Sequence, residues 1–286
     1  MRNKNAKYLI IFVTLVSFVL LPAITEAGGL DSSKKKAPEK VKKKVVQQEP
    51  LFTFIGRELV IGFEEKYMAE RNFQHSRFSE GDIQFESLQH LGTLSYEFIE
   101  GQTIKGKLGA ARIENKAWGY GKHDYELAWG FGGEWDVVKC INRYFPKMHA
   151  ALPGEINTIF SGQYFVIGSD KETAAGGSSL EEEWREWDIS ITFSKSLNAF
   201  TPYIGAALSW AEIKTKLDQN ISGVENFDGT LKADDHIGGF IGTDIDFSKC
   251  GKLGNIPFVR DLSAHFEVRA FDELAFTSGL NYTFQF

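Results

Sequence analysis

The sequence predicts an all-β fold, an antiparallel transmembrane up-and-down β-barrel of about ten strands, with eight strands as the alternative. Three observations support it: side chains alternate with a period of two, the alternating segments are long, and helical periodicity is missing. Between residues 125 and 137, aromatic and apolar side chains occupy every second position, and Gly, Ala, Asp and Glu lie between them. Because successive side chains of a strand point to opposite faces, such a segment has one apolar face and one small, acidic face.

Ten segments alternate in this way. Several exceed the roughly 5–6 residues of an ordinary soluble strand. They suit the roughly 9–11 residues that a tilted strand needs to cross a bilayer. The predicted strands are 57–68, 85–99, 103–113, 124–138, 155–168, 184–196, 201–213, 235–248, 261–272 and 275–286.

Alternation alone fits two architectures. A soluble barrel points its apolar face inward, whereas a transmembrane barrel points it outward to lipid. Trp and Tyr recur near segment ends, as in the aromatic girdles at the two membrane interfaces. The connections also tend to alternate between short and long, although those at 139–154 and 249–260 are long where short turns are expected. The aromatic positions are Trp118, Tyr125, Trp135, Trp184, Trp187, Tyr203, Trp210 and Tyr282.

The transmembrane alternative places charged side chains in the barrel interior. With ten strands we expect these charges to pair and to occlude the interior, because open aqueous channels belong to barrels of about 16 strands. In a wider barrel they would line a cation-favouring pore. The candidates are Lys105, Lys107, Glu126, Glu134, Asp136, Asp188, Asp244, Asp246, Glu267 and Arg269.

The N-terminal fifty residues differ from the rest. Residues 1–27 combine a basic start, a long apolar run and small residues before Gly28, which predicts a cleaved secretory signal peptide. Residues 28–50 are rich in Lys and have no aromatic residue, which predicts a disordered linker. Residues 1–27 carry a net charge of +2, and residues 28–50 carry +4. Since the whole chain carries −6, the predicted barrel domain, 51–286, carries −12. A domain this acidic argues against nucleic-acid binding.

The C-terminal segment ends on an aromatic residue and has apolar or aromatic residues at alternate positions: Leu280, Tyr282, Phe284 and Phe286. In this it resembles the closing strand of bacterial outer-membrane β-barrel proteins. Residues 201–208 and 238–242 are similar to strands of small barrels of the OmpA and opacity type, although many of those have eight strands. The resemblance implies lipid-facing positions for the four residues and recognition by the barrel-assembly machinery and periplasmic chaperones. It also implies the outer membrane of a Gram-negative-type bacterium, with the linker in the periplasm.

Motifs for catalysis or metal binding are lacking. The sequence contains no nucleophile elbow, zinc-protease, Walker or EF-hand pattern. We therefore predict neither enzymatic activity nor a cofactor or metal site. Asp234, Asp235 and His236 form the strongest acid and base cluster, at a predicted external rim. Cys140 and Cys250 follow two predicted strands, and the compartment would permit a disulfide between them or two separate thiols.

The sequence therefore predicts an integral outer-membrane barrel with a structural or surface role, or a porin-like protein with a narrow, occluded pore. One alternative is a barrel enzyme with its site at the external rim. Another is a secreted soluble barrel that binds an apolar ligand.

Overall fold

The computed structural model describes residues 58–74, 83–115, 124–144, 156–168, 172–173, 179–218 and 227–285. The predicted signal peptide, the predicted linker, Trp118 and Phe286 lie outside these residues, so the first two stay predictions. Within the described part of the chain, no helix is long and apolar enough to cross a membrane.

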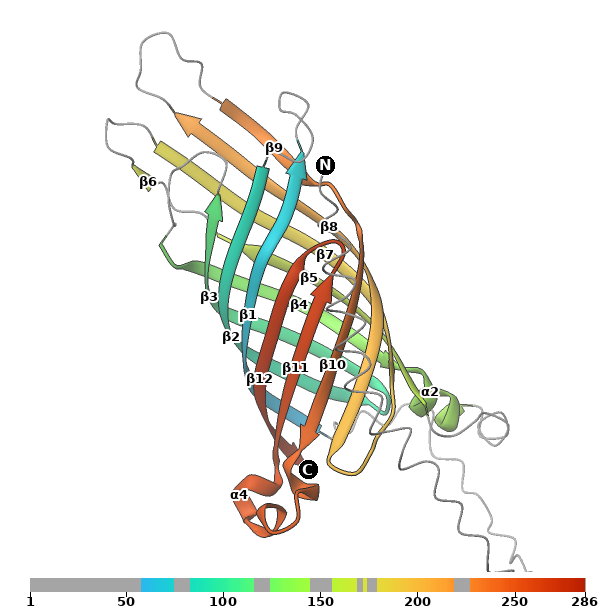
Figure 1. Cartoon of the computed structure of the whole chain (residues 1–286). Coiled ribbons are helices and arrows are strands. Elements are labelled where there is room, and N and C mark those ends of the chain that lie inside the picture. Colours follow the sequence, from blue (N-terminus) through green and yellow to red (C-terminus); the bar gives the residue numbers. More distant parts are fainter. Residues whose placement is uncertain are drawn as a thin grey trace, which may run out of the picture. The chain divides into compact units, whose positions relative to one another are not determined.

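Ten antiparallel strands form a closed barrel (Figure 1). Each strand pairs with its neighbours in the chain, and β1 closes the barrel against β12. The prediction of an up-and-down barrel with ten strands is confirmed, and the alternative of eight strands is wrong. The barrel strands are β1 (Glu58–Gln74), β2 (Ile83–Ile99), β3 (Gln102–Asn115), β4 (Glu126–Asp136), β5 (Asn157–Ile167), β7 (Ser179–Ser194), β8 (Phe200–Asp218), β10 (Ile237–Asp246), β11 (Leu262–Ala270) and β12 (Leu274–Gln285).

Short elements occupy the two ends of the barrel. We call the end at which β1 begins and β12 finishes the terminal end, and the opposite end the loop end. The terminal end carries helix α2 (Val137–Tyr144), the 3₁₀ helices η1 (Phe247–Lys249) and η2 (Leu253–Asn255), and the one-turn helix α4 (Pro257–Arg260). The loop end carries the short strands β6 (Glu172–Thr173) and β9 (Phe227–Ala233).

Five strands extend at least two residues farther toward the loop end than their alternation predicted. β1 continues to Gln74 instead of 68, β3 to Asn115 instead of 113 and β8 to Asp218 instead of 213, while β2 begins at Ile83 instead of 85 and β7 at Ser179 instead of 184. The additional strand β9 pairs with β8 and, at Phe73 and Gln74, with β1. It therefore bridges these two strands beyond the point where β10, β11 and β12 end.

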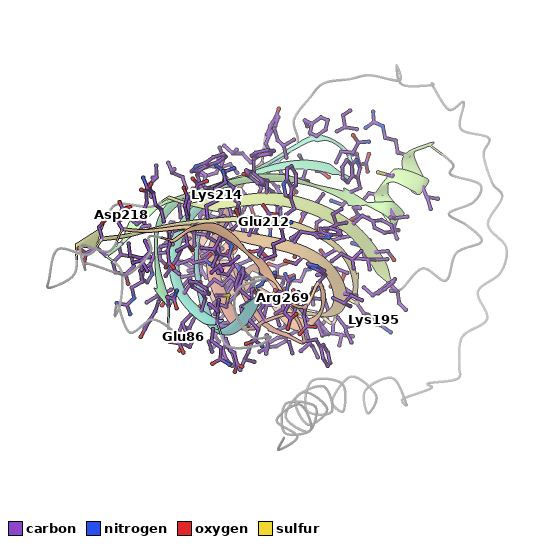
Figure 2. All side chains as sticks on the ribbon, turned by 90° about the horizontal axis from the view of Figure 1, so that it is seen from above. Glu86, Lys195, Glu212, Lys214, Asp218 and Arg269 are labelled. Carbon is purple, nitrogen blue, oxygen red and sulfur yellow. The ribbon has the colours of Figure 1, made fainter. Side chains whose placement is uncertain are left out.

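The apolar face of the wall changes sides along the barrel. Over most of the wall, large apolar side chains lie on the outer surface, where Leu108, Leu127 and Phe131 are more than half exposed. We call β9 and the parts of β1, β2, β3, β7 and β8 nearest the loop end the extension. There the inner face is mainly apolar, apart from the buried Asn115, Glu182 and Thr215, and most charged side chains point outward. Figure 2 labels three of the charged side chains on β8: Glu212, Lys214 and Asp218. Because of this change, Trp184 does not lie in an outer aromatic girdle as predicted. It lies inside the barrel and is 2% exposed.

Candidate functional site: the barrel interior

The part of the interior nearest the terminal end is a polar cavity of about 490 Å³, which we call the lumen cavity. Its lining includes Val60, Thr103 and Ser194, which lie close to the strand ends at the terminal end. Small residues widen the interior on one wall, where Gly130, Gly132 and Gly162 lie among the lining residues. The titratable residues of the lining are Glu64, Lys66, Lys105, Lys107, Glu134, Tyr164, Asp188, Tyr203, Asp244, His265, Glu267 and Arg269.

Charged groups of opposite sign pair across the lumen cavity. The Lys107 ammonium donates to both Glu64 carboxylate oxygens, at 2.8 and 3.0 Å, and the Lys105 ammonium donates to Glu134 at 2.5 Å. The Tyr203 hydroxyl donates to Glu267 at 3.1 Å. The side chains of Lys105 and Glu134 are about one third exposed, so water reaches this pair.

Farther toward the loop end lies a compact group of charged residues, the ion-pair layer: Lys66, Arg71, Glu186, Asp188, Arg269, Asp272 and Glu273. The Arg71 guanidinium donates to Glu186 at 2.7 Å, to Glu273 at 3.2 Å and to the Ser209 hydroxyl at 2.5 Å. Lys66 pairs with Glu273 at 2.7 Å. Because a buried charge is tolerated only with good partners, these contacts fix the positions of strands distant in the sequence.

The turn between β11 and β12 completes this layer from one side. It folds Asp272 and Glu273 into the barrel, where they are 4% and 3% exposed. Arg269 donates from Nε to both Asp272 carboxylate oxygens at 3.1 Å, and from Nη1 to Asp188 at 2.6 Å. Phe271, just before the acidic pair, has a φ of 85°. A large side chain rarely adopts this backbone conformation, and here it lets the two carboxylates turn inward.

An apolar layer, the apolar cap, fills the interior beyond the ion-pair layer. The rings of Phe73, Phe85 and Trp184 pack edge to face, with centroids 5.0 to 6.4 Å apart. The Arg71 guanidinium carbon lies 5.5 Å from the Trp184 ring centroid, so a cation–π contact joins the two layers. The apolar cap consists of Phe73, Ile83, Phe85, Ile113, Leu180, Trp184, Ile213, Leu217, Leu231 and Ala233, all buried.

The three layers follow one another along β1 and β7. Toward the loop end, β7 presents Ser190 to the lumen cavity, Glu186 to the ion-pair layer and Trp184 to the apolar cap. In β1 the same order is Glu64, Arg71 and Phe73. Within the described residues, the lumen cavity has no lining residue from the apolar cap. The interior is thus polar at one end and packed like a protein core at the other.

The structure places the charged candidates in three positions. Glu126 begins β4 on the inner face, opposite Ala111. Asp136 accepts hydrogen bonds from Asn157 and from the Lys139 backbone at the terminal end, and Asp246 caps η1 there. Neither of these aspartates lines the lumen cavity. The remaining seven candidates, Lys105, Lys107, Glu134, Asp188, Asp244, Glu267 and Arg269, do line it.

Sequence reasoning missed Arg71 and Glu273, the two residues that join Glu186 in the ion-pair layer. Arg71 fell in a predicted loop, and the signal that could have found Glu273 was the acidic pair in the short connection after Arg269. The separation of 202 residues between Arg71 and Glu273 gives no local pattern.

The C-terminal candidates lie on the outer surface. Leu280 and Phe284 are 52% and 41% exposed, and Tyr282 packs beside Phe284 with ring centroids 4.7 Å apart. Phe286 lies outside the described residues.

The two cysteines are free thiols, so the alternative of a disulfide between them is not what the structure contains. Cys140 lies in α2, near the Gly101 carbonyl, and Cys250 follows η1, near the Asp246 carbonyl. They occupy connections that follow β4 and β10, which three other strands separate in the sheet. Burial, and then the Asp136 carboxylate, raise the pKa of the Cys140 thiol above its ordinary value.

The acid and base cluster at the loop end is engaged in local structure. The Asp234 backbone N–H donates to the Asn72 carbonyl, and a His236 ring nitrogen lies 2.9 Å from the Ser209 carbonyl. The His236 ring also packs near Trp210. Within the described residues, no group of three or more His, Cys, Asp or Glu side chains could hold a metal ion.

No family model matches the sequence, and no curated protein matches it. Solved structures similar to it include an outer membrane channel from Pseudomonas putida F1, with 9% identity, 86% of this chain and 100% of that chain covered, and a TM-score of 0.42. The outer membrane protease OmpT from Escherichia coli has 10% identity, with 83% and 99% covered and a TM-score of 0.40. The outer membrane protein OprG from Pseudomonas aeruginosa has 10% identity, with 81% and 97% covered and a TM-score of 0.40. The chain is a closed ten-stranded antiparallel barrel.

Proposed function

We propose that the chain is an occluded, non-enzymatic outer-membrane barrel with a structural or surface role, whose loop end faces the cell exterior. The observation that carries the proposal is the stacking of the ion-pair layer and the apolar cap across the interior. An ion that enters the lumen cavity from the terminal end meets Arg71, Glu186 and Glu273, each at most 6% exposed. Beyond them it meets the packed rings of Phe73, Phe85 and Trp184. Paired charges followed by packed rings make the passage of a hydrated ion costly.

The outer surface supports placement in a membrane. Exposed large apolar residues follow one another along neighbouring strands, for example Ile104 and Leu108 in β3, and Trp129 and Phe131 in β4. A soluble protein rarely exposes so extended an apolar surface. The secreted soluble alternative would require this surface to meet water while charged groups occupy the interior.

The extension supports the choice of the exterior side. Beyond Trp187 and Trp210 the outer face becomes charged, with Arg185 in β7 and Lys214 in β8, while the inner face becomes mainly apolar. A wall with a charged outer face and an apolar inner face is stable when water surrounds it. Outer-membrane barrels carry their longer extensions and loops on the extracellular side, so we assign the loop end to the exterior.

The test is conductance of the refolded monomer in planar bilayers. We expect no resolved current steps from the natural protein. The variant with Arg71→Ser, Phe73→Ser, Phe85→Ser and Trp184→Ser removes the central contacts of both inner layers, and we expect it to conduct. Each protein is first shown to be folded by faster migration unheated than boiled on a detergent gel. Regular unitary steps from the natural monomer would overturn the occluded barrel.

The side assignment is tested by labelling intact cells with a membrane-impermeant maleimide. In a background with Cys140→Ser and Cys250→Ser, we expect Lys214→Cys to react in intact cells. The matched variant Lys249→Cys, at the terminal end, should react only after the outer membrane is permeabilised. The reverse pattern would contradict the assignment of the loop end to the exterior.

A further inference from the structure

The connection between β10 and β11 exposes two large apolar side chains outside the strands. Ile256 precedes α4 and is 47% exposed, and Phe258 lies in α4 and is 64% exposed. A long turn at the end of a barrel strand needs neither of them for its own packing. Their exposure therefore calls for a partner outside this connection.

The connection has a definite structure. Gly254 of η2 packs directly against η1, since a Cβ atom at this position would lie 2.1 Å from the Ser248 carbonyl oxygen. Asp261 then ties the connection to β12, because its carbonyl accepts from the Thr283 backbone at 2.8 Å and its carboxylate accepts from the Tyr282 hydroxyl at 3.3 Å. Ile256 and Phe258 are thereby held on a fixed support.

This support lies on the outer surface of the barrel. The Phe258 ring stacks on Tyr282 with centroids 5.4 Å apart, and Tyr282 packs against Phe284 at 4.7 Å. Tyr282 alternates with Leu280 and Phe284 on the outward face of β12, and its partner in β1 is the exposed Ile61. The exposed side of Phe258 thus continues the apolar outer surface of β12 and β1. Figure 1 shows α4 beside the lower ends of these strands.

The charges of the connection fit the edge of a phospholipid leaflet. Lys249, Lys252 and Arg260 are exposed in this connection. Lys249 pairs with Asp246 at 3.1 Å and Arg260 with Asp261 at 3.3 Å, so the connection keeps a small excess of positive charge. Apolar side chains flanked by basic ones are the composition that binds at a bilayer interface, where the bases meet anionic headgroups.

We propose that the β10–β11 connection is a membrane-interface anchor, in which Ile256 and Phe258 enter the phospholipid leaflet at the terminal end of the barrel. The inference rests on the proposed placement of the barrel in a membrane. It adds a contact with lipid that the strands themselves do not make, and it fixes the depth of the terminal end in the bilayer.

Site-directed spin labelling tests this anchor. The full mature chain with Cys140→Ser and Cys250→Ser receives one label, at Phe258→Cys, Lys252→Cys or Phe284→Cys, in vesicles of phosphatidylethanolamine and phosphatidylglycerol. Collision rates with oxygen, which concentrates in lipid, are compared with those of a water-soluble nickel chelate. Ile256→Cys is the second position if Phe258→Cys does not fold.

We expect oxygen to exceed nickel at positions 258 and 284, and the order to reverse at 252, in the same connection. Nickel exceeding oxygen at 258 while 284 stays in lipid would overturn the anchor and leave the barrel placement intact. Shielding of 258 from both reagents, with line broadening between labels, would assign the surface to a second copy and overturn it as well. Nickel exceeding oxygen at 284 would overturn the membrane placement itself, and with it the anchor.

Discussion

Trp184 and Trp187 lie three residues apart in β7 and occupy opposite environments. Trp184 is 2% exposed and packs inside the barrel against Phe73 and Phe85, whereas Trp187 is 55% exposed on the outer face. They mark the change between two regions of one wall. Toward the terminal end, polar groups lie inside and apolar groups outside, as a wall surrounded by lipid requires. In the extension, the apolar groups lie inside, as a wall surrounded by water requires.

The ion-pair layer lies between these regions, and its disruption should have the largest effect. Arg71→Ala leaves Glu186 and Glu273 buried without their guanidinium partner, and we expect a loss of about 3–5 kcal/mol in the free energy of unfolding. Urea unfolding in phospholipid vesicles measures it. The matched control is Arg185→Ala, because Arg185 lies on the outer face of β7 with its side chain 40% exposed, paired with Glu183. We expect at most about 1 kcal/mol there.

A double variant makes this prediction sharper. Arg71→Met with Glu186→Gln removes the unpaired carboxylate together with the arginine and leaves Glu273 paired with Lys66. It should recover part of the stability that Arg71→Ala loses. Equal losses for Arg71→Ala and Arg185→Ala would show that the layer contributes no more than a surface pair.

The apolar cap should respond as a soluble core does. Leu231 in β9 is 0% exposed, and Leu231→Ala should cost about 2–5 kcal/mol by leaving a cavity. Because β9 joins β8 to β1 only in the extension, we expect faster amide hydrogen exchange in β9 and in residues 211–218 of β8. Exchange in the lipid-facing part of the wall should stay unchanged.

Leu280→Ala, on the outward face of β12, is the control for the cap. Leu280 is 52% exposed, and its truncation should leave exchange in β9 unchanged. A uniform increase of exchange around the whole barrel in Leu231→Ala would show that the extension and the lipid-facing wall unfold together. The two regions would then not differ in local stability.

The limits of the sequence-based prediction follow from the same change of environment. Alternation identified all ten barrel strands because a lipid-facing wall repeats one rule along its length, as in Tyr125–Val137. It failed at residues 69–74 and 179–183, where the apolar residues change faces and charges such as Glu181 and Glu183 suggested a loop. The structure places Glu181 and Glu183 in β7, with Leu180 and Trp184 on the opposite, inner face.

The interior was predictable only in part. A period of two assigns a face to each residue, so candidates such as Lys105 and Glu134 could be placed together on an inner surface. It does not say which strands lie opposite, nor where a strand passes from lipid to water. The inward position of Glu273 depends on Arg71 and Lys66, which come from the other end of the domain.

The smallest expected loss of stability is in the lumen cavity, and it distinguishes this cavity from the ion-pair layer. The Lys105–Glu134 pair lies in the lumen cavity with side chains 37% and 29% exposed, whereas the partners of Arg71 are nearly inaccessible. Water and salt screen the exposed pair, so Lys105→Ala should cost less than about 1 kcal/mol of unfolding free energy. The double variant with Glu134→Ala should show little coupling, and added salt should reduce it further. A loss as large as that of Arg71→Ala would mean that the lumen cavity is as dry as the ion-pair layer, and the polar interior would then be one buried network instead of two.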